Sequence, residues 1–345
     1  SAEVFGWEQR HLFAGSWVCL GREADLLPAA TTQRAHDVGG VPVLLTRAGG
    51  QLRALANTCR HRGHELLPAG QAAGRRSLVC PYHGWSYGLD GALLAAPGFR
   101  DLPAFDPAQH GLVDLPLQRW HGWLFVNASG DAPDFAESLG DLDGLVAPYA
   151  PERLVQLAAE SYDVAANWKV VHENFHECYH CPLIHPELCR VSPPDSGANF
   201  DGSGDWVGGR MVLREGVQTM SLDGQGAGAA LPGLDDRGRR SVLYLDLLPN
   251  LLLSLHPDYV LTHRLEPIAM DQTRIECAWY FPAAGTDPGY AVDFWDKTNR
   301  QDWAACESVQ RGLSSPHYRP GLLAPREDAV YRFVTLIGRA YLGCG

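Results

Sequence analysis

Histidines and glutamates are concentrated in one stretch of the chain, between Asn167 and Pro186. A solvent-exposed helix face has no need of such a density, and a buried core tolerates unpaired polar groups poorly. We therefore expect this stretch to bind a metal ion. Imidazole ligands favour iron, zinc, copper or nickel over magnesium or calcium. The candidate ligands are His172, Glu173, His176, Glu177, His180 and His185.

A helix predicted over residues 167–181 would position these side chains. At about 100° per residue, Glu173, Glu177 and His180 lie on the same face of such a helix. Pro182 ends or kinks the helix, so that His185 can turn back toward His180. Two carboxylates and two imidazoles would then approach one another.

Three interpretations of this stretch are compatible with the residues alone. The run from His172 to His176 matches the H-E-x-x-H pattern of zinc metalloproteases, in which the glutamate is a general base. Alternatively, His180 and His185 join a distant carboxylate in the facial triad of non-haem iron oxygenases, which leaves positions open for O2 and substrate. The third interpretation is a structural cluster of histidines without a metal.

The composition argues against several other classes of protein. The chain has 28 basic and 40 acidic residues and a formal charge of -12, so no nucleic-acid partner is expected. No apolar run reaches membrane-spanning length and no signal peptide is recognised, so we expect a cytoplasmic protein without a membrane partner. The nine cysteines are scattered through 345 residues. A chain of this size does not need a disulfide framework, so we expect reduced cysteines, some of them ligands.

The expected fold class is α+β, with a domain boundary near residue 150, between Pro148 and Pro151. Residues 1–150 are expected to be β-rich, with a hairpin formed by residues 41–45 and 52–55. In residues 151–345 we expect an antiparallel sheet covered by helices. Its expected strands cover residues 154–164, 206–213, 241–255 and 274–280, and its expected helices cover 167–181 and 290–312. The glycine-rich residues 222–238 are expected to form a loop.

A second group of potential ligands lies in the β-rich half. Cys59 and His61 fall in one loop between expected strands, and Cys80 and His83 fall in another. A single zinc ion held by all four would strain the short Cys-x-His spacing. That difficulty disappears if both cysteines bind one iron and both histidines bind a second, as in a Rieske [2Fe-2S] cluster. The sequence therefore predicts a Rieske cluster at these four residues.

With both groups on one chain, the sequence resembles the Rieske-type non-haem iron oxygenases, in their terminal oxygenase (α) component. The resemblance extends over nearly the whole length. It is carried by the two Cys-His pairs, by Asn167-Trp168-Lys169, by Glu173-Asn174, and by Glu177, His180 and His185 in their spacing. It implies an N-terminal all-β Rieske domain, residues 1–150, joined to a catalytic domain with mononuclear Fe(II), residues 151–345.

The resemblance also changes how four neighbouring residues are interpreted. The zinc protease pattern loses its support, so His172 and His176 are expected to be helix-packing or surface histidines. Cys178 and Cys181 form a Cys-x-x-Cys motif inside the expected helix rather than at its N-terminus, where a thiolate would be stabilised. We expect both cysteines to be buried packing residues.

The third ligand of the mononuclear iron is expected on the C-terminal helix. One stripe of that helix is apolar apart from Asn299 and Asp302, and a carboxylate on a buried stripe must be paired or coordinated. Asp302 also matches the C-terminal acid of the resembled family, so His180, His185 and Asp302 are the expected iron ligands. Asp296 and Glu307 are the alternatives. A capping or ion-paired aspartate is the structural interpretation of Asp302.

The resemblance implies roles for further residues. In this family the acid at Glu177 receives a hydrogen bond from an iron ligand and from a cluster histidine of the neighbouring subunit. By that likeness, His83 of one subunit faces Glu177 of the next, which requires a homotrimer. Asn174 either faces the pocket beside the iron or packs on the helix. Trp85 either covers the cluster from water or is an ordinary strand residue.

The expected cofactors are therefore a [2Fe-2S] Rieske cluster and a mononuclear Fe(II), with O2 as co-substrate. The resemblance implies that electrons come from NAD(P)H through a flavin and iron-sulfur reductase, with or without a ferredoxin. This reductase is expected to be a separate protein, because this chain has no convincing dinucleotide fingerprint. The protein orients a small-molecule substrate while the cofactors perform the oxidation.

The expected substrate is a quaternary ammonium compound, which would be hydroxylated or oxidatively N-demethylated. The sequence around the expected iron ligands is similar to that of the choline monooxygenase and glycine-betaine or proline-betaine demethylase branch of the family. Aromatic faces can hold such a cation, and Trp206, Tyr244 and Tyr259 are available. An aromatic-ring hydroxylating or natural-product tailoring oxygenase is the first alternative. A Rieske electron carrier without oxygenase activity is the second, although the complete His180, His185 and Asp302 set argues against it.

Overall fold

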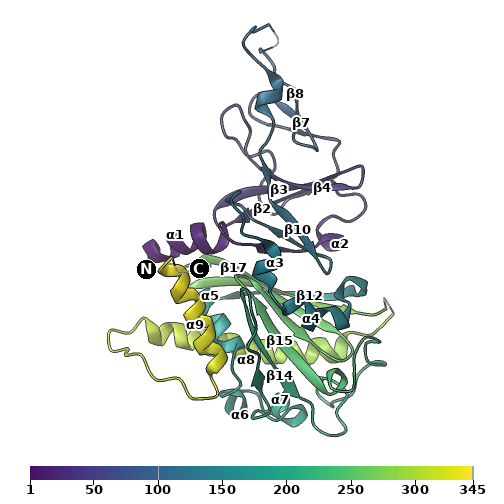
Figure 1. The fold of residues 1–345 in the computed structure, drawn as a ribbon, viewed down its shortest axis with the longest axis vertical. Coiled ribbons are helices and arrows are strands. Elements are labelled where there is room, and N and C mark those ends of the chain that lie inside the picture. The colour runs from purple at the N-terminus through teal and green to yellow at the C-terminus, as the bar shows by residue number, and fades with distance from the viewer. Residues whose placement is uncertain (100, 284, 344–345) are drawn as a thin grey trace. The chain divides into compact units, whose positions relative to one another are not determined.

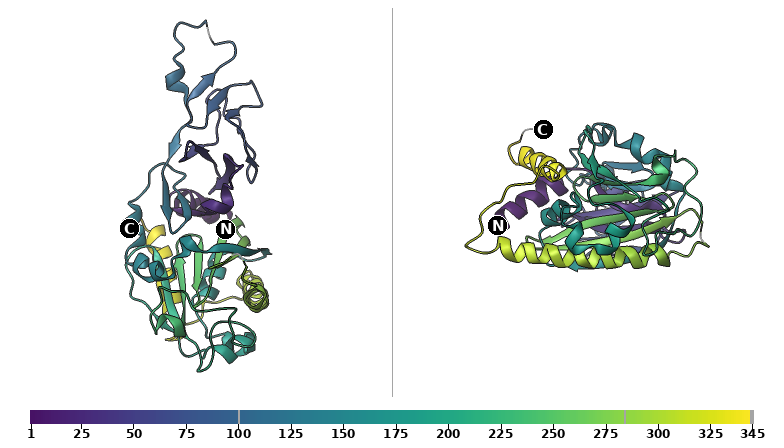
Figure 2. Two further views of the ribbon diagram at one scale, coloured as in Figure 1. Left: turned by 90° about the vertical axis from the view of Figure 1, so that its right-hand side faces the viewer. Right: turned by 90° about the horizontal axis from the view of Figure 1, so that it is seen from below.

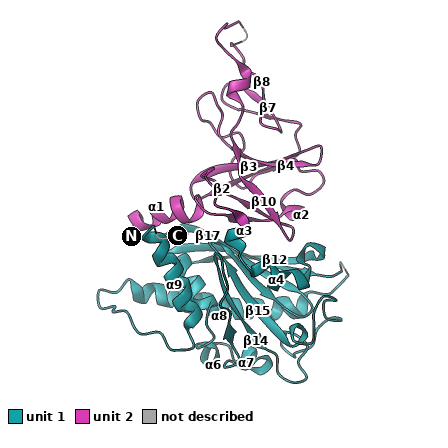
Figure 3. Cartoon of the chain, viewed as in Figure 1, with its two compact units in different colours: residues 1, 136–345 teal, residues 2–135 magenta. Residues whose placement is uncertain are grey.

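The structure is a computed structural model that describes residues 1–99, 101–283 and 285–343 (Figure 1). The chain forms two compact units, one of residues 2–135 and one of residues 136–345 together with Ser1 (Figure 3). Residues 136–150 thus belong to the C-terminal unit rather than to the β-rich half. Within the described residues, no helix combines the length and the apolar character that crossing a bilayer requires.

The N-terminal unit is built from three small antiparallel sheets. Helix α1 (Ala2–Glu8), a π-helical turn (Gln9–Phe13) and α2 (Glu23–Leu26) accompany them. One sheet has the order β1-β11-β10, from Val18–Arg22, Trp123–Val126 and Leu117–Trp120. The five-stranded sheet has the order β5-β2-β3-β4-β9, from Ala72–Ala73, Gln33–Val38, Val41–Ala48, Gln51–Ala56 and Asp114–Leu115. The third contains β6 (Ser77–Val79), β7 (Ser86–Gly88) and β8 (Leu93–Ala95) and is followed by a 3-10 turn (Pro107–His110).

The predicted hairpin is confirmed as β3 and β4. Its two-residue turn is Gly49-Gly50, with φ angles of 54° and 79°. Positive φ at both central residues gives the twist that joins antiparallel strands, and glycine adopts it without steric cost.

A seven-stranded antiparallel sheet forms the centre of the C-terminal unit. Its order is β12-β18-β17-β16-β15-β14-β13, so the first strand of the unit pairs with the last. The expected segment 241–255 is two strands, and β17 was not predicted. The strands are β12 (Val155–Val164), β13 (Ala198–Asn199), β14 (Trp206–Val212), β15 (Ser241–Leu247), β16 (Leu251–Leu255), β17 (Val260–Ala269) and β18 (Gln272–Phe281).

Helices cover this sheet, and their apolar sides form the core of the unit with the inward side chains of the strands. Figure 2 shows the longest helix, α8, lying along the sheet, and α5 contacts α8, α9 and β17. The region 222–238 forms neither helix nor strand before a 3-10 turn at Gly238–Arg240, as expected for a loop. The helices are α3 (Phe135–Leu139), α4 (Leu142–Val146), α5 (Trp168–Phe175), α6 (Cys181–Ile184), α7 (Pro186–Val191), α8 (Gly289–Leu313) and α9 (Asp328–Tyr341), with 3-10 turns at Ala147–Tyr149 and Pro151–Arg153.

The predicted helix over residues 167–181 is wrong at its C-terminal end. Helix α5 starts as expected, because the Asn167 side chain accepts the backbone N–H of Lys169 as its N-cap. It ends at Phe175. Beyond it, the carboxylate of Glu177 accepts the backbone N–H groups of Tyr179 and His180, which diverts them from helical hydrogen bonds.

Candidate metal centres

Two loops of the N-terminal unit carry the predicted cluster ligands, and they have the same backbone geometry. In the first, the N–H of Cys59 donates to His64 O at 2.9 Å, and Gly63 donates back to Cys59 O at 2.9 Å. In the second, Cys80 donates to Trp85 O at 2.8 Å, and Gly84 donates back at 3.0 Å. Gly63 and Gly84 have φ angles of 75° and 74°, which a residue with a Cβ rarely adopts.

The paired loops bring the two predicted histidine ligands together, and likewise the two predicted cysteine ligands. The rings of His61 and His83 are 4.6 Å apart between centroids. Burial raises the pKa of the Cys80 thiol, and the adjacent Cys59 thiol raises it further. A pair of adjacent buried thiols and a pair of adjacent imidazoles match the donor set of a Rieske cluster.

Neighbouring side chains support this donor set. The buried Nδ1 of His61 has no hydrogen-bond partner within the described part of the chain, which leaves it free for a metal. Trp85 is buried and stacks on His61 with an interplanar angle of 7° and a centroid distance of 5.0 Å. Tyr87 Oη lies 3.3 Å from Cys59 Sγ and accepts the backbone N–H of Arg60. Trp85 therefore covers the ring of His61, one of the predicted cluster ligands.

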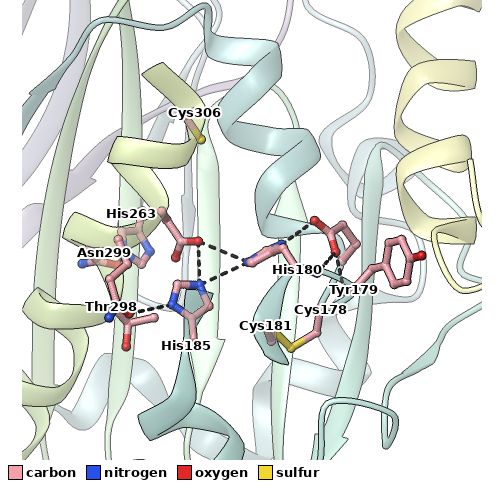
Figure 4. A network of polar contacts seen from close by, with 12 residues as sticks. Cys178, Tyr179, His180, Cys181, His185, His263, Thr298, Asn299 and Cys306 are labelled. Carbon is pink, nitrogen blue, oxygen red and sulfur yellow. Dashed lines mark hydrogen bonds and ion pairs between the residues drawn. A yellow bond between two sulfur atoms is a disulfide. The ribbon is translucent and has the colours of Figure 1, made fainter. Parts of the chain in front are cut away.

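In the C-terminal unit, His180, His185 and Asp302 converge on one point. Figure 4 shows the rings of His180 and His185 directed toward each other. The two Nε2 atoms are 3.1 Å apart. Asp302 Oδ1 lies 2.8 Å from His185 Nε2 and 3.3 Å from His180 Nε2. His180 comes from the turn after α5, His185 from the junction of α6 and α7, and Asp302 from α8. The three residues that the sequence grouped as iron ligands are thus adjacent.

Hydrogen bonds at the far side of each ring orient both imidazoles. His180 Nδ1 donates to the carboxylate of Glu177, and His185 Nδ1 donates to Gln301 Oε1 at 2.7 Å. With the proton on Nδ1, each Nε2 presents a lone pair to the other. Two lone pairs and a carboxylate oxygen at this distance repel one another unless a cation lies between them. The donor set therefore fits a metal ion in a two-histidine, one-carboxylate site.

The charges in the triad are strongly coupled. Burial disfavours the imidazolium of His180, but hydrogen bonds to Asp302 and Glu177 outweigh it and raise its pKa to about 9. Burial also works against the Asp302 carboxylate, but the two histidines hold the pKa of Asp302 below its usual value. Metal binding at these donors therefore competes with binding of a proton.

A cavity of about 440 Å³ opens onto this triad. Asn174, for which the sequence allowed either a place in the pocket or a packing role on the helix, lines this cavity. Asp296 and Glu307, the alternative ligands, are engaged elsewhere: Asp296 bonds Tyr162 and Arg300, and Glu307 accepts the N–H of Ala165.

Three aromatic rings form part of the cavity wall. Phe175 and Tyr244 meet edge to face at 6.0 Å between centroids, and Tyr244 meets Trp295 in the same way at 6.2 Å. Burial raises the pKa of Tyr244, and the charge of Asp302 adds to the effect. Tyr244 Oη is buried and, so far as the chain is described, has no hydrogen-bond partner. A neutral hydroxyl is therefore available beside the triad.

Of the three aromatic residues that the sequence offered for holding a cation, two do not line the cavity, namely Trp206 and Tyr259. Trp206 donates its Nε1 hydrogen to Asp141 at 3.1 Å. Tyr259 donates to Met220 O at 3.0 Å and accepts from Trp295 Nε1 at 2.8 Å, within the core. Both side chains lie on strands or next to them, where aromatic residues commonly fill the core.

The sequence reasoning missed a buried acid that binds the other two histidines of the stretch. His172 Nδ1 lies 2.5 Å and His176 Nε2 lies 2.9 Å from the same oxygen of Asp246 on β15. All three side chains are buried. The packing role expected for His172 and His176 is confirmed, but they are also paired with a charge. A lone aspartate between leucines on an apolar strand was the available signal.

The expectation of reduced, packing cysteines was wrong for one pair. Cys178 and Cys181 form a disulfide across the turn between α5 and α6. Because the helix ends at Phe175, the two residues lie in a tight turn with their Cα atoms 4.9 Å apart, within disulfide range.

Comparisons with known proteins agree with both centres. Residues 16–106 match the family described as Rieske [2Fe-2S] domain, and residues 151–343 match the family described as ring hydroxylating alpha subunit (catalytic domain). The glycine betaine monooxygenase oxygenase subunit of Chromohalobacter salexigens is 33% identical, over 92% of this chain and 78% of its own length. The carnitine monooxygenase oxygenase subunit of Escherichia coli K12 is 30% identical, over 92% and 83%.

Solved structures share the fold. A quaternary ammonium Rieske monooxygenase in complex with its substrate L-carnitine superposes with a TM-score of 0.80, at 24% identity, over 99% of this chain and 93% of that one. Naphthalene 1,2-dioxygenase with indole bound has a TM-score of 0.73 at 20% identity, over 99% and 89%. The family carries a Rieske cluster and a mononuclear iron, and the donor sets of both units fit these cofactors. This chain belongs to the Rieske non-haem iron oxygenases and is an oxygenase α subunit of that family.

Proposed function

We propose that Cys59, Cys80, His61 and His83 hold the [2Fe-2S] cluster and that His180, His185 and Asp302 hold the mononuclear iron. When bound, these groups supply electron transfer and O2 activation. The convergence of the three donor atoms of the triad, all within 3.3 Å of one another, carries the proposal. The complete triad also separates this chain from a Rieske protein that only carries electrons.

The ligand assignment predicts a defined metal content. Iron and acid-labile sulfide per chain, measured with an EPR spectrum of the reduced protein, should give three irons, two sulfides and a Rieske signal. In His180→Ala the sulfide and the Rieske signal should stay while one iron is lost. Loss of sulfide instead would contradict the assignment.

We further propose that the substrate is a quaternary ammonium compound, which is hydroxylated or N-demethylated next to its nitrogen. The ring trio of Phe175, Tyr244 and Trp295 supports this, because aromatic faces attract such cations by about 0.5–2 kcal/mol. The trio lines the same cavity as the triad, so a methyl group of a bound cation would lie near the iron site. The related glycine betaine and carnitine monooxygenase subunits carry substrates of this class in their names.

Binding of neutral and cationic ligands tests the substrate class. Titration calorimetry with glycine betaine, carnitine, choline and the neutral indole should detect the cations and not indole. Tyr244→Ala should weaken cation binding by about tenfold. Tyr318→Ala, at an exposed tyrosine outside the cavity, should bind like the parent protein. Indole binding with no response to any of the cations would favour the aromatic-ring alternative.

The chain's own side chains contribute orientation and proton placement. Glu177 holds the proton on His180 Nδ1, and Gln301 holds it on His185 Nδ1, so both Nε2 atoms stay available to the metal. Tyr244 can donate its Oη hydrogen to a polar group of the substrate. The apolar rings of the wall exclude water from the position of the reacting carbon.

We propose that the chain acts as a homotrimer in which His83 of one subunit approaches Glu177 of the next. The surroundings of both residues support this: His83 and Tyr82 are exposed on the N-terminal unit, and Tyr179, whose N–H the Glu177 carboxylate accepts, is exposed on the C-terminal unit. Mass photometry should therefore give a trimer.

Mixed trimers test the contact directly. Co-expressed His83→Ala and Glu177→Gln subunits, purified through two different tags, should recover turnover that each variant lacks alone. In a mixed trimer the intact His83 of one subunit meets the intact Glu177 of its neighbour. No recovery in verified mixed trimers would contradict the contact.

Electrons are proposed to come from NAD(P)H in the cytoplasm through a separate flavin and iron-sulfur reductase, with or without a ferredoxin. Substrate-stimulated NAD(P)H oxidation upon adding such a reductase is the corresponding assay.

A further inference from the structure

The Cys178–Cys181 disulfide surrounds one of the proposed iron ligands. The bond joins the two ends of a four-residue turn whose interior residues are Tyr179 and His180. Both cysteines line the cavity that opens onto the triad. Cys181 is buried, with 3% of its surface exposed, and Cys178 is partly buried. A small molecule in the cavity can therefore reach this pair of sulfurs from the side on which O2 is used.

The disulfide also lies between the hydrogen bonds that hold His180 and the hydrogen bond that holds the backbone of His185. On one side, the Glu177 carboxylate binds the N–H groups of Tyr179 and His180 and the ring of His180. On the other side, Cys181 O accepts the N–H of His185 at 2.8 Å. Within the turn itself, the backbone hydrogen bond seen among the described residues is the long one from Cys181 N–H to Cys178 O, at 3.3 Å. The sulfur bridge is thus a second covalent connection, besides the peptide chain, between Cys178, which follows Glu177, and Cys181, whose carbonyl accepts the His185 N–H.

We propose that Cys178 and Cys181 form a redox-active dithiol that reacts with hydrogen peroxide, and that its disulfide form holds His180 in the position for iron binding. The second part rests on the proposed iron ligation, whereas the first does not. Peroxide is the product when O2 gains two electrons without oxygen transfer to a substrate. An O2-activating cavity is therefore a place where it can arise.

The reaction consumes one peroxide and two thiols. The Cys178 sulfur, which is the more accessible, attacks one peroxide oxygen; the O–O bond breaks, a first water leaves, and a sulfenic acid remains on Cys178. The Cys181 sulfur then attacks the Cys178 sulfur, and the sulfenic oxygen leaves as a second water. The thiols lose two electrons, and the peroxide gains them. A dithiol reductant reverses the reaction by thiol–disulfide exchange.

Thiol counting on the full-length holoprotein tests the reaction. The protein is reduced with a phosphine, freed of reductant, treated with one equivalent of hydrogen peroxide, denatured and alkylated. Intact mass should show two fewer alkyl groups than the reduced sample, and peptide mapping should locate the bond between Cys178 and Cys181. Cys189→Ser, at a partly buried free cysteine outside the turn, should behave like the parent protein. An unchanged alkyl count, or sulfinic acid on Cys178 without a disulfide, would overturn the proposal.

Iron release tests the consequence for the triad. Transfer of mononuclear iron to a coloured chelator should be about tenfold faster in the reduced protein than in the disulfide form, as for loss of other groups that orient a metal ligand. Cys178→Ser should release iron at the faster rate with or without reductant, while Cys189→Ser should follow the parent protein. Equal rates of iron release in the two redox forms would refute the proposal that the disulfide holds His180 in position. Iron and sulfide analysis of the same samples separates this failure from a failure of the proposed ligation, because the latter would leave only cluster iron.

Discussion

Replacing Asp246 by asparagine tests how strongly a buried charge attaches helix α5 to the sheet. The Asp246 carboxylate on β15 accepts one imidazole N–H from His172 of α5 and one from His176, the residue directly after α5, and it is fully buried. Phe333 of α9 stacks on His172 at 5.0 Å with an interplanar angle of 3°, which keeps water away from the group. The asparagine side chain would keep an oxygen acceptor of the same size but remove the charge.

The expected loss follows from the two hydrogen bonds. A bond to a charged group contributes about 1.5–3 kcal/mol, and a neutral one about 0.5–1.5 kcal/mol. Two bonds therefore lose about 2 kcal/mol of unfolding free energy in Asp246→Asn. For a unit the size of residues 136–345, this corresponds to a fall in Tm of about 4–8 °C.

Circular dichroism during heating measures this loss, and cluster absorbance monitors the N-terminal unit separately. Asp163→Asn is the matched control, because its ion pair with Arg274 is exposed on the same sheet and is worth about 0.5 kcal/mol. An Asp246→Asn Tm equal to that of the control would refute the reasoning.

The difference in Tm between the parent protein and Asp246→Asn should depend on pH in a defined way. Burial works against the Asp246 carboxylate, but the two histidines outweigh it and lower its pKa below the usual value. The stability from this group is therefore fully present above the unfolded aspartate pKa of about 3.9 and is lost as the pH falls through the lower folded value. The Tm gap between parent and Asp246→Asn should stay constant near neutrality and close in acid. A gap that widens in acid would contradict the sign.

Three further changes separate the two metal centres. His180→Ala should abolish O2-coupled turnover and keep the visible spectrum of the cluster, whereas His317→Ala, at an exposed histidine, should change neither. Gln301→Leu removes the acceptor of the His185 Nδ1 proton and should weaken mononuclear iron binding about 10–100-fold in a chelator competition, with normal sulfide content. Cys80→Ser should prevent assembly of the cluster, seen as missing visible absorbance and missing sulfide, while one chelatable iron remains.

Residue type and spacing were sufficient to predict which potential metal ligands lie close together. The Cys-His pairs occupy matching loops, and His180, His185 and Asp302 meet although Asp302 lies far along the chain. Asp302 could be identified because a carboxylate on an apolar helical stripe needs a partner.

Tertiary contacts account for what the sequence did not reveal. The end of α5 depends on Glu177 capturing two backbone N–H groups, a competition that helical periodicity does not register. The partner of His172 and His176 lies on a strand far along the chain, so no local pattern indicates it. Likewise, the Cys-x-x-Cys motif forms a disulfide in the turn that follows α5, in a segment where the sequence predicted helix.

Helix α8 also limits how the family can vary in length. Its Asn299 bonds His263 at 3.1 Å, its Gln301 and Asp302 both contact His185, and its Gln310 accepts the N–H of Asn167 at 2.9 Å. Deleting one residue between these positions would rotate the later ones by about 100° and shift them by about 1.5 Å. All the later contacts would fail together, so no single compensating substitution could restore them. Insertions and deletions among homologues should therefore collect outside α8, for example in the segment 314–327, while α8 keeps its residue count through divergence of the rest.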